Sequence, residues 1–134
     1  MLKVFVDTAA WLALNDKNDQ YHKEAMAKSL EIKAKKIKLI TSEYILDESI
    51  TLIRYRVSHQ AAVIFGDSLF KSRIVRIVDI TEGNRLKAWE IFKKYNDKEL
   101  SFTDCTSFVL IKNLKLQKAF TFDKHFEQIG VTIF

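Results

Sequence analysis

Residues 2–8 read Leu-Lys-Val-Phe-Val-Asp-Thr, and this stretch decides the fold. Residues 2–6 form an apolar run typical of a buried strand, and the pattern of residues 8–14 predicts a helix directly after it. The carboxylate of Asp7 lies at the junction between the two. A buried strand that leads into a helix is typical of the βαβ units of parallel sheets.

The rest of the chain continues this alternation. Further strands are predicted at residues 38–41, 73–78, 118–122 and 131–134. Further helices are predicted at residues 20–35, from a Ser42 cap to about residue 57, and at residues 59–71, 82–95 and 102–114. Because helices separate the strands, we expect an α/β fold, a three-layer α/β/α sandwich around a parallel five-stranded sheet. With no linker or repeat, residues 1–134 are expected to form one domain.

The composition favours a folded cytoplasmic protein. Hydrophobic residues make up 48% of the chain, and no apolar run approaches the roughly 20 residues of a membrane span. The apolar stretch at the start of the chain ends at Asp7 and is too short for a signal peptide. The one cysteine, Cys105, forms no internal disulfide, as in a reducing compartment. The net charge of +5 favours polyanionic partners such as nucleic acid.

Many common enzyme sites are excluded by composition. There is no proline, and the three glycines cannot form a glycine-rich nucleotide-binding loop. An H-E-x-x-H zinc motif and a G-x-S-x-G nucleophile motif are both missing, and a lone cysteine excludes a cysteine-rich zinc site. The remaining candidates for chemistry are acidic side chains.

Three acids follow predicted strands. Asp7 follows residues 2–6, Asp123 follows residues 118–122, and Asp79 follows residues 73–78. Because parallel strands end at the same edge of a sheet, the side chains of Asp7 and Asp123 are expected at one crevice. Asp79 meets the same positional criterion, so position alone does not single out a site.

Helical periodicity adds Asp104 and leaves Glu48 open. Asp104 falls on the apolar arc of its predicted helix, between Ile111 and Phe108, and an unpaired inward carboxylate requires a cation or strong donors. Glu48 and Asp47 flank opposite edges of the apolar arc of theirs, so periodicity barely separates them. A structural interpretation stands beside the catalytic one, because acids at these junctions also cap helices, and Ser101-x-x-Asp104 matches a capping box.

Converging carboxylates need a cation. At about 5 Å and an effective dielectric of about 20, each pair costs roughly 3 kcal/mol. Oxygen ligands suit Mg²⁺ and Mn²⁺, which activate water for attack on a phosphate. His125, two residues after Asp123, is a lesser candidate for contact with substrate. The nearby aromatic side chains, Phe102 and Phe122 among them, are interpreted as core rather than as base-stacking platforms.

Four segments occur in order along the chain: VFVDT at residues 4–8, YILDE at 44–48, LSFTD at 100–104 and TFDKHF at 121–126. On these segments the sequence resembles the PIN-domain nucleases, and among them the VapC-type toxins of type II toxin–antitoxin pairs. The resemblance covers essentially the whole chain. It implies an α/β/α sandwich and a Mg²⁺- or Mn²⁺-dependent endoribonuclease that cleaves RNA, is often a homodimer, and is neutralised by a small antitoxin.

The resemblance also assigns roles to the acids. The family's acidic positions fall on Asp7, Glu48, Asp104 and Asp123, which favours Glu48 over Asp47. Asp7 and Asp104 are expected to bind the metal directly, and Glu48 and Asp123 to bind it through water or to position the attacking water. Cys105 stands where relatives commonly carry a smaller residue such as alanine.

Two other functions compete with this one. A non-catalytic PIN-like module would bind RNA or a partner through its basic surface. A haloacid-dehalogenase-like phosphatase would also place an acid after the first strand, but it needs a second aspartate two residues after Asp7, where Ala9 stands.

Overall fold

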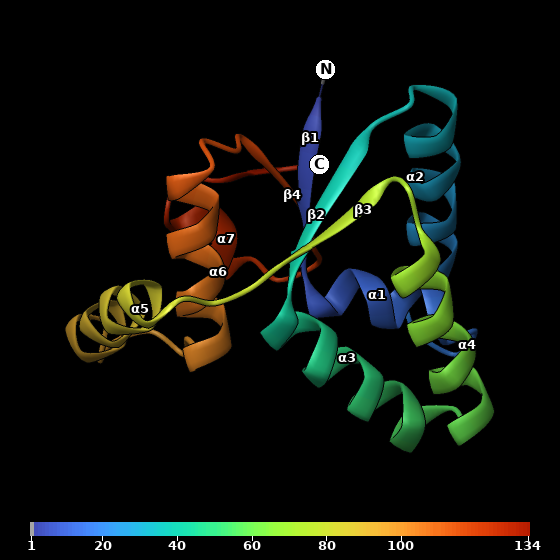
Figure 1. Cartoon of the computed structure of the whole chain (residues 1–134), viewed down its shortest axis with the longest axis horizontal. Helices are drawn as coiled ribbons and strands as arrows, with labels where there is room; N and C mark the ends of the chain where they lie inside the picture. Colours follow the sequence, from blue (N-terminus) through green and yellow to red (C-terminus); the bar gives the residue numbers. More distant parts are fainter. Residues whose placement is uncertain (1) are drawn as a thin grey trace.

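The computed structural model describes residues 2–134, so Met1, the first residue of the predicted domain, lies outside the described residues. Five parallel strands form one sheet in the order β3-β2-β1-β4-β5 (Figure 1). The strands are β1 (Lys3–Val6), β2 (Lys38–Ser42), β3 (Val75–Val78), β4 (Lys118–Phe120) and β5 (Thr132–Ile133). The predicted parallel five-stranded sheet is therefore confirmed.

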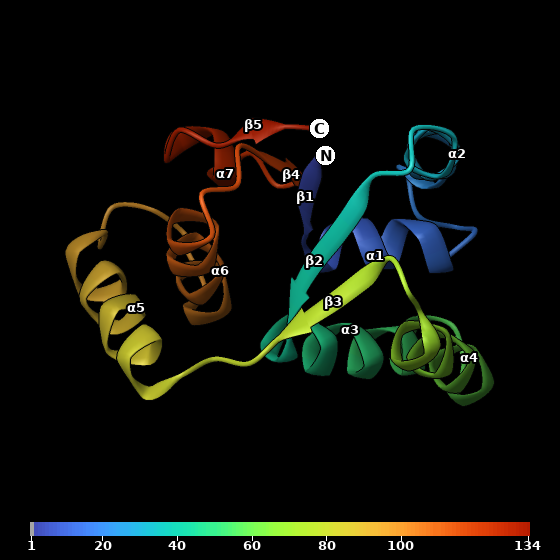
Figure 2. The ribbon, with the colours of Figure 1, turned by 45° about the horizontal axis from the view of Figure 1, so that its top comes forward.

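Helices cover both faces of the sheet. They are α1 (Thr8–Asn15), α2 (His22–Ala34), α3 (Glu43–Arg56), α4 (His59–Lys71), α5 (Glu82–Lys94), α6 (Phe102–Asn113) and α7 (His125–Gln128). In Figures 1 and 2, α1 to α4 lie on one side of the strands and α5 to α7 on the other. Right-handed crossovers explain this division, because the chain steps from β1 to β2 and β3 in one direction and from β4 to β5 in the other. The three-layer sandwich is confirmed.

The central strand is buried on both faces, as a parallel sheet requires. Val4, Phe5 and Val6 have no exposed surface. A chain of buried hydrogen bonds connects α1 to this strand, because the Trp11 indole N–H donates to Thr41 Oγ1 at 3.3 Å and that hydroxyl donates to the Val6 carbonyl at 2.9 Å. These hydrogen bonds fix the position of the end of β1, directly before Asp7. Among residues 2–134, no helix has both the length and the apolar character needed to cross a bilayer.

All the predicted elements agree with the structure to within two residues, and two of the strands differ by two residues at one end. The predicted strand 118–122 ends at Phe120. The hydroxyl of Thr121 then donates to the Asp7 carboxylate at the end of β1 and accepts the backbone amide of Asp123, which begins a turn. The predicted strand 73–78 begins at Val75, because the Ser72 hydroxyl accepts the amides of Ile74 and Val75 and forms a turn. The short helix α7 follows Asp123 and was not predicted.

Candidate active site

The order of the strands reverses between β1 and β4, and the acids gather at this point. The chain leaves β1 for β2 and β3 and then crosses back to β4 on the other side of β1. Ligands bind outside the carboxyl ends of parallel strands at such a reversal. Asp7 directly follows β1, and Asp123 comes three residues after β4 ends. The Asp7 amide donates to the Phe120 carbonyl at 3.1 Å, which keeps the two strand ends level.

Asp7 is a buried carboxylate with one hydrogen-bond donor. Its side chain is 4% exposed, and one of its oxygens accepts the Thr121 hydroxyl at 2.9 Å. Burial, together with the nearby charge of Asp104, raises the pKa of Asp7 from 3.8 to about 7. Asp7 occupies the N-cap position of α1, but its side chain forms no capping hydrogen bond, which contradicts the capping interpretation for this residue.

Asp104 both caps helix α6 and belongs to the group of acids. Ser101 Oγ accepts the Asp104 amide at 2.9 Å, and one Asp104 oxygen accepts the Ser101 amide at 3.1 Å, so the predicted capping box is present. Burial, and then the charge of Asp123, raise the pKa of Asp104 above its usual value. The capping box fixes the rotamer of Asp104 with one oxygen and leaves the other free to face the cluster.

Asp123 lies in a tight turn with His125. One oxygen of Asp123 accepts the backbone amide of His125 at 2.9 Å and lies 2.8 Å from His125 Nδ1. The ring nitrogen is buried and forms no hydrogen bond with correct geometry. Single ligand atoms of Asp104, Asp123 and His125 all lie within 4.8 Å of one another, an arrangement that can hold a metal ion. The sequence analysis treated His125 as a lesser candidate for contact with substrate, and the structure places its ring beside Asp123 and Asp104.

Thr121 connects two of the acids and was not singled out from the sequence. Its hydroxyl donates to Asp7 and accepts the Asp123 amide at 3.0 Å. It therefore sets the position of both carboxylates with one oxygen. The only sequence signal was its place at the end of a predicted strand, two residues before an acid.

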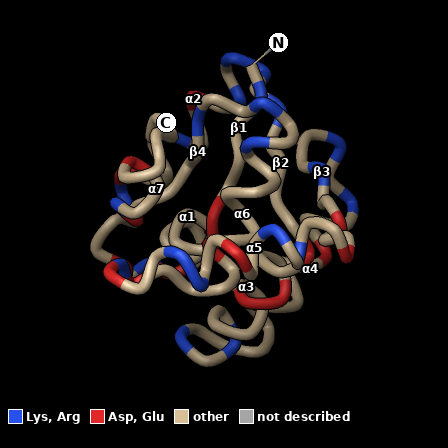
Figure 3. Tube along the Cα trace, turned by 90° about the vertical axis from the view of Figure 1, so that its left-hand side faces the viewer, with Lys and Arg blue, Asp and Glu red and all other residues tan. Residues whose placement is uncertain are grey.

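No lysine or arginine pairs with these three acids among the described residues. The ion pairs found among residues 2–134 include none between Asp7, Asp104 or Asp123 and a lysine or arginine. Figure 3, which views the side of the molecule that carries α5, shows acidic segments beside the labels of α3 and α6. Three neighbouring carboxylates without a lysine or arginine partner are therefore candidates to hold a cation.

Glu48 is separate from this cluster. It lies on α3 and lines a hollow of about 440 Å³ whose opposite wall is formed by Phe102 and Thr103 of α6, directly before Asp104. Asp47 lines the same hollow, but its side chain is exposed whereas that of Glu48 is half-buried. The structure therefore brings Asp7, Asp104 and Asp123 together and places Glu48 across the adjoining hollow.

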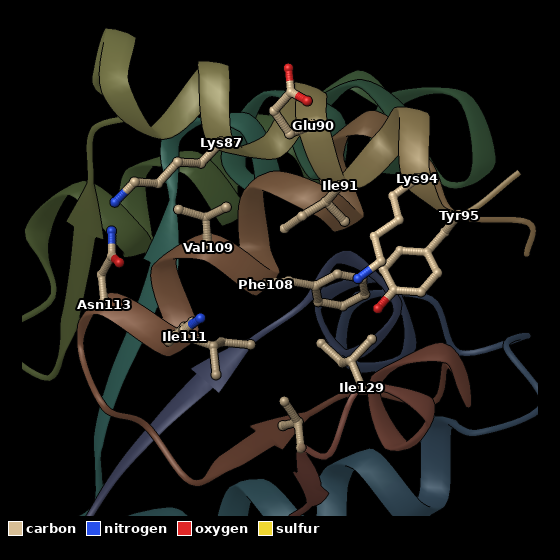
Figure 4. A pocket seen from close by; sticks show the side chains of 12 residues that line it. Lys87, Glu90, Ile91, Lys94, Tyr95, Phe108, Val109, Ile111, Asn113 and Ile129 are labelled. Atoms are coloured by element: carbon tan, nitrogen blue, oxygen red, sulfur yellow. The ribbon is translucent and has the colours of Figure 1, made fainter.

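A larger pocket of about 620 Å³ lies elsewhere, between α5, α6 and the segment around α7. Figure 4 shows side chains of α5 and α6 facing each other across it, with Phe108 and Ile91 from the two helices. Its lining is mainly apolar with lysines at the rim, and none of the four predicted acids belongs to it. The candidate catalytic side chains therefore lie outside this pocket.

Comparison with known proteins identifies the family. A family model of the PIN domain matches residues 4–131, a range that contains all four predicted acids. The 23S rRNA-specific endonuclease VapC20 of Mycobacterium tuberculosis is 34% identical over 127 residues, which cover 95% of this chain and 94% of that protein. The VapC ribonuclease of Archaeoglobus fulgidus is 28% identical over 127 residues, 93% of this chain and 80% of that protein.

Solved structures agree with the sequence matches. The crystal structure of M. tuberculosis VapC20, described as a sarcin–ricin loop cleaving toxin, matches with a TM-score of 0.86 at 32% identity and covers 96% of each chain. The DNA-bound VapBC of Salmonella typhimurium has the same fold, with a TM-score of 0.69 at 18% identity over 100% of this chain and 98% of that chain. The chain therefore belongs to the PIN domain family, and within it to the VapC ribonucleases.

Proposed function

We propose that residues 1–134 form a single-domain, metal-dependent endoribonuclease that hydrolyses RNA phosphodiester bonds and serves as the toxin of a toxin–antitoxin pair. The observation that carries the proposal is the meeting of Asp7, Asp104 and Asp123 at one crevice without a lysine or arginine partner. The names of the relatives support it, since the VapC20 protein of M. tuberculosis is a 23S rRNA-specific endonuclease.

The donor set fits Mg²⁺ or Mn²⁺. Its carboxylate oxygens are ligands that these hard ions prefer. Burial and the neighbouring acids disfavour the ionised form of Asp7 in the metal-free chain, and a bound cation would favour it. When bound, the ion supplies Lewis-acid activation of water and neutralises charge on the phosphate.

The chain's own residues then have distinct roles. Asp7 and Asp104 are the proposed direct ligands, and Asp123 and Glu48 are proposed to hold and orient the attacking water. Thr121 keeps Asp7 and Asp123 at the correct spacing through its two hydrogen bonds. Such supporting contacts fix the orientation of metal ligands, and their loss typically lowers metal affinity or activity by roughly 10- to 100-fold.

The proposal includes partners and location. A ribonuclease toxin needs a neutralising antitoxin, and the VapC20 relative is described as a toxin. We propose a small cognate antitoxin, a homodimeric state and a cytoplasmic location, where RNA substrates are available. The net charge of +5 supports RNA as the substrate through attraction to phosphates.

RNA cleavage by the purified chain tests the function. Wild-type protein with Mn²⁺ is expected to cut an RNA that contains the sarcin–ricin loop, and a chelator is expected to stop the reaction. Asp7→Asn and Asp104→Asn are expected to abolish cleavage while the protein stays folded. Asp79→Asn, which alters an exposed acid after β3, is the matched control and is expected to cleave normally. Full activity of both site variants would refute the proposal, and RNA binding without cleavage by the wild type would favour the non-catalytic module.

A further inference from the structure

We propose that an exposed aromatic cluster beside the carboxylates stacks unpaired bases of the RNA next to the bond that is cut. The cluster consists of Trp89 and Phe92 on α5 and Phe102 at the start of α6, and we call it the aromatic shelf. This inference rests on the proposed ribonuclease function and adds to it the part of the chain that holds the substrate.

The rings of the shelf pack against one another, and two of them are exposed to solvent. The ring centroids of Trp89 and Phe92 lie 5.5 Å apart, and their planes differ by 13°. Phe102 meets both rings edge-on, at 6.2 Å from Trp89 and 6.4 Å from Phe92. Trp89 is 48% exposed and Phe92 is 40% exposed. Two large aromatic side chains thus leave much of their surface uncovered.

Burial in the core does not explain these residues. Leu86, one turn before Trp89 on the same helix, is 61% exposed, so the apolar surface continues along α5. Contiguous exposed apolar surface on a folded chain marks a place of interaction. The prediction that the aromatics near the acids belong to the core therefore does not extend to α5, and Phe102, which is half-buried, lies between the core and the surface.

The shelf is continuous with the candidate active site. Phe102 lies two residues before Asp104 and, with Thr103, lines the hollow whose opposite wall carries Glu48. It also packs against Tyr44 of α3, at 6.5 Å between ring centroids. Aromatic surface thus runs from α5 to the edge of the carboxylate crevice. A nucleotide whose phosphate lies at the acids would therefore have a neighbouring base on the side of Phe102, the ring of the shelf next to Asp104 in the chain.

The charge of the region favours RNA over an apolar protein partner. Helix α5, Glu82–Lys94, carries four basic and two acidic side chains. Single-stranded nucleic acid is bound by basic surface that attracts the backbone combined with aromatic rings that stack the bases. Every base has a flat face, so this contact positions the strand with little regard to sequence.

RNA binding by a cleavage-deficient chain tests the shelf. The Asp104→Asn protein is titrated into a labelled, unstructured RNA oligonucleotide, and fluorescence anisotropy gives Kd. Adding Trp89→Leu is expected to weaken binding at least about fivefold, which is the loss of one stacked base. Trp89→Phe keeps a flat ring and is expected to restore most of the affinity. Phe70→Ala, which removes a 66% exposed aromatic on α4, is the matched control and is expected to bind normally.

Two further readouts separate the outcomes. Trp11, the other tryptophan, is 6% exposed, so fluorescence quenching by RNA is expected to arise from Trp89. An oligonucleotide of abasic nucleotides is expected to bind equally to the Trp89→Leu chain and to its parent, because it offers nothing to stack.

Equal affinity of Trp89→Leu and its parent for normal RNA would overturn the proposal. So would Trp89 fluorescence that responds to protein concentration but not to RNA, which would make the shelf a protein interface. Residual cleavage by Asp104→Asn would count against the proposed catalysis and not against the shelf.

Discussion

Replacing Asp7 with asparagine is expected to stabilise the metal-free protein in a way that depends on pH. The pKa of Asp7 is about 7 in the folded chain, raised mainly by burial, whereas its ordinary value is 3.8. The folded chain therefore holds the proton more tightly than the unfolded chain, and stability is lost as the pH rises through this range. At 1.36 kcal/mol per pKa unit, a shift of this size amounts to about 4 kcal/mol.

An asparagine side chain does not titrate, so the variant escapes this loss. The free energy of unfolding of Asp7→Asn minus that of the wild type is expected to increase by up to about 4 kcal/mol between pH 4 and pH 8. Urea denaturation in the presence of a chelator measures both proteins at each pH, and taking the difference cancels the titrating groups that do not interact with Asp7. Adding Mn²⁺ at pH 8 is expected to stabilise the wild type and not the variant, because the ion binds the folded site.

A difference that stays the same at every pH would refute this reasoning, because it would mean that Asp7 is ionised in the folded chain without a cation. The matched control is Asp79→Asn, at an exposed position, which is expected to unfold within about 0.5 kcal/mol of the wild type.

Three other substitutions test separate parts of the site. Thr121→Val removes both hydrogen bonds that join Asp7 to Asp123 and is expected to reduce the rate of RNA cleavage by about 10- to 100-fold. Thr121→Ser retains the hydroxyl and is the control. Equal cleavage rates of Thr121→Val and the wild type would contradict a role for this link. Ser101→Ala breaks the capping box of α6 and is expected to lower the free energy of unfolding by about 1 kcal/mol in urea melts, and no change would contradict the capping contribution. Glu48→Gln is expected to impair cleavage more strongly than Asp47→Asn in the same assay, because only the side chain of Glu48 is half-buried in the hollow beside α6; the reverse order would exchange their roles.

The sequence was enough to predict the sheet and the three converging acids, because both follow from short-range patterns. Alternation of apolar runs with helical periodicity predicts a parallel sheet, and the sheet brings Asp7 and Asp123 to the same edge. Asp104 was predicted because a carboxylate on the apolar arc of a helix stands out against its neighbours. In the structure one of its oxygens lies within 4.8 Å of ligand atoms of Asp123 and His125.

Other features depend on contacts that no local pattern shows. Glu48 and Asp47 are adjacent on one helix and line the same hollow, so only their relative burial and the family resemblance separate them. The link through Thr121 depends on the end of β4 lying level with the end of β1. His125 approaches the acids because α7 begins directly after the turn at Asp123. A helix of four residues is too short for its periodicity to be recognised in the sequence.

The shelf on α5 is a further example. Helical periodicity puts Ala88, Ile91, Phe92 and Tyr95 on one apolar face of α5, but Phe92 is 40% exposed in the structure. The pattern also does not show that Trp89 meets Phe102 from a different helix. That contact arises from the packing of α5 against α6, which no local sequence pattern predicts.

The most direct test of the central claim is a crystallographic anomalous difference map from crystals of this protein soaked in Mn²⁺. We predict a strong peak between the carboxylates of Asp7 and Asp104, with Asp123 beside it. A map with no peak at the crevice at millimolar Mn²⁺, or with a lysine or arginine side chain in that position, would contradict the account.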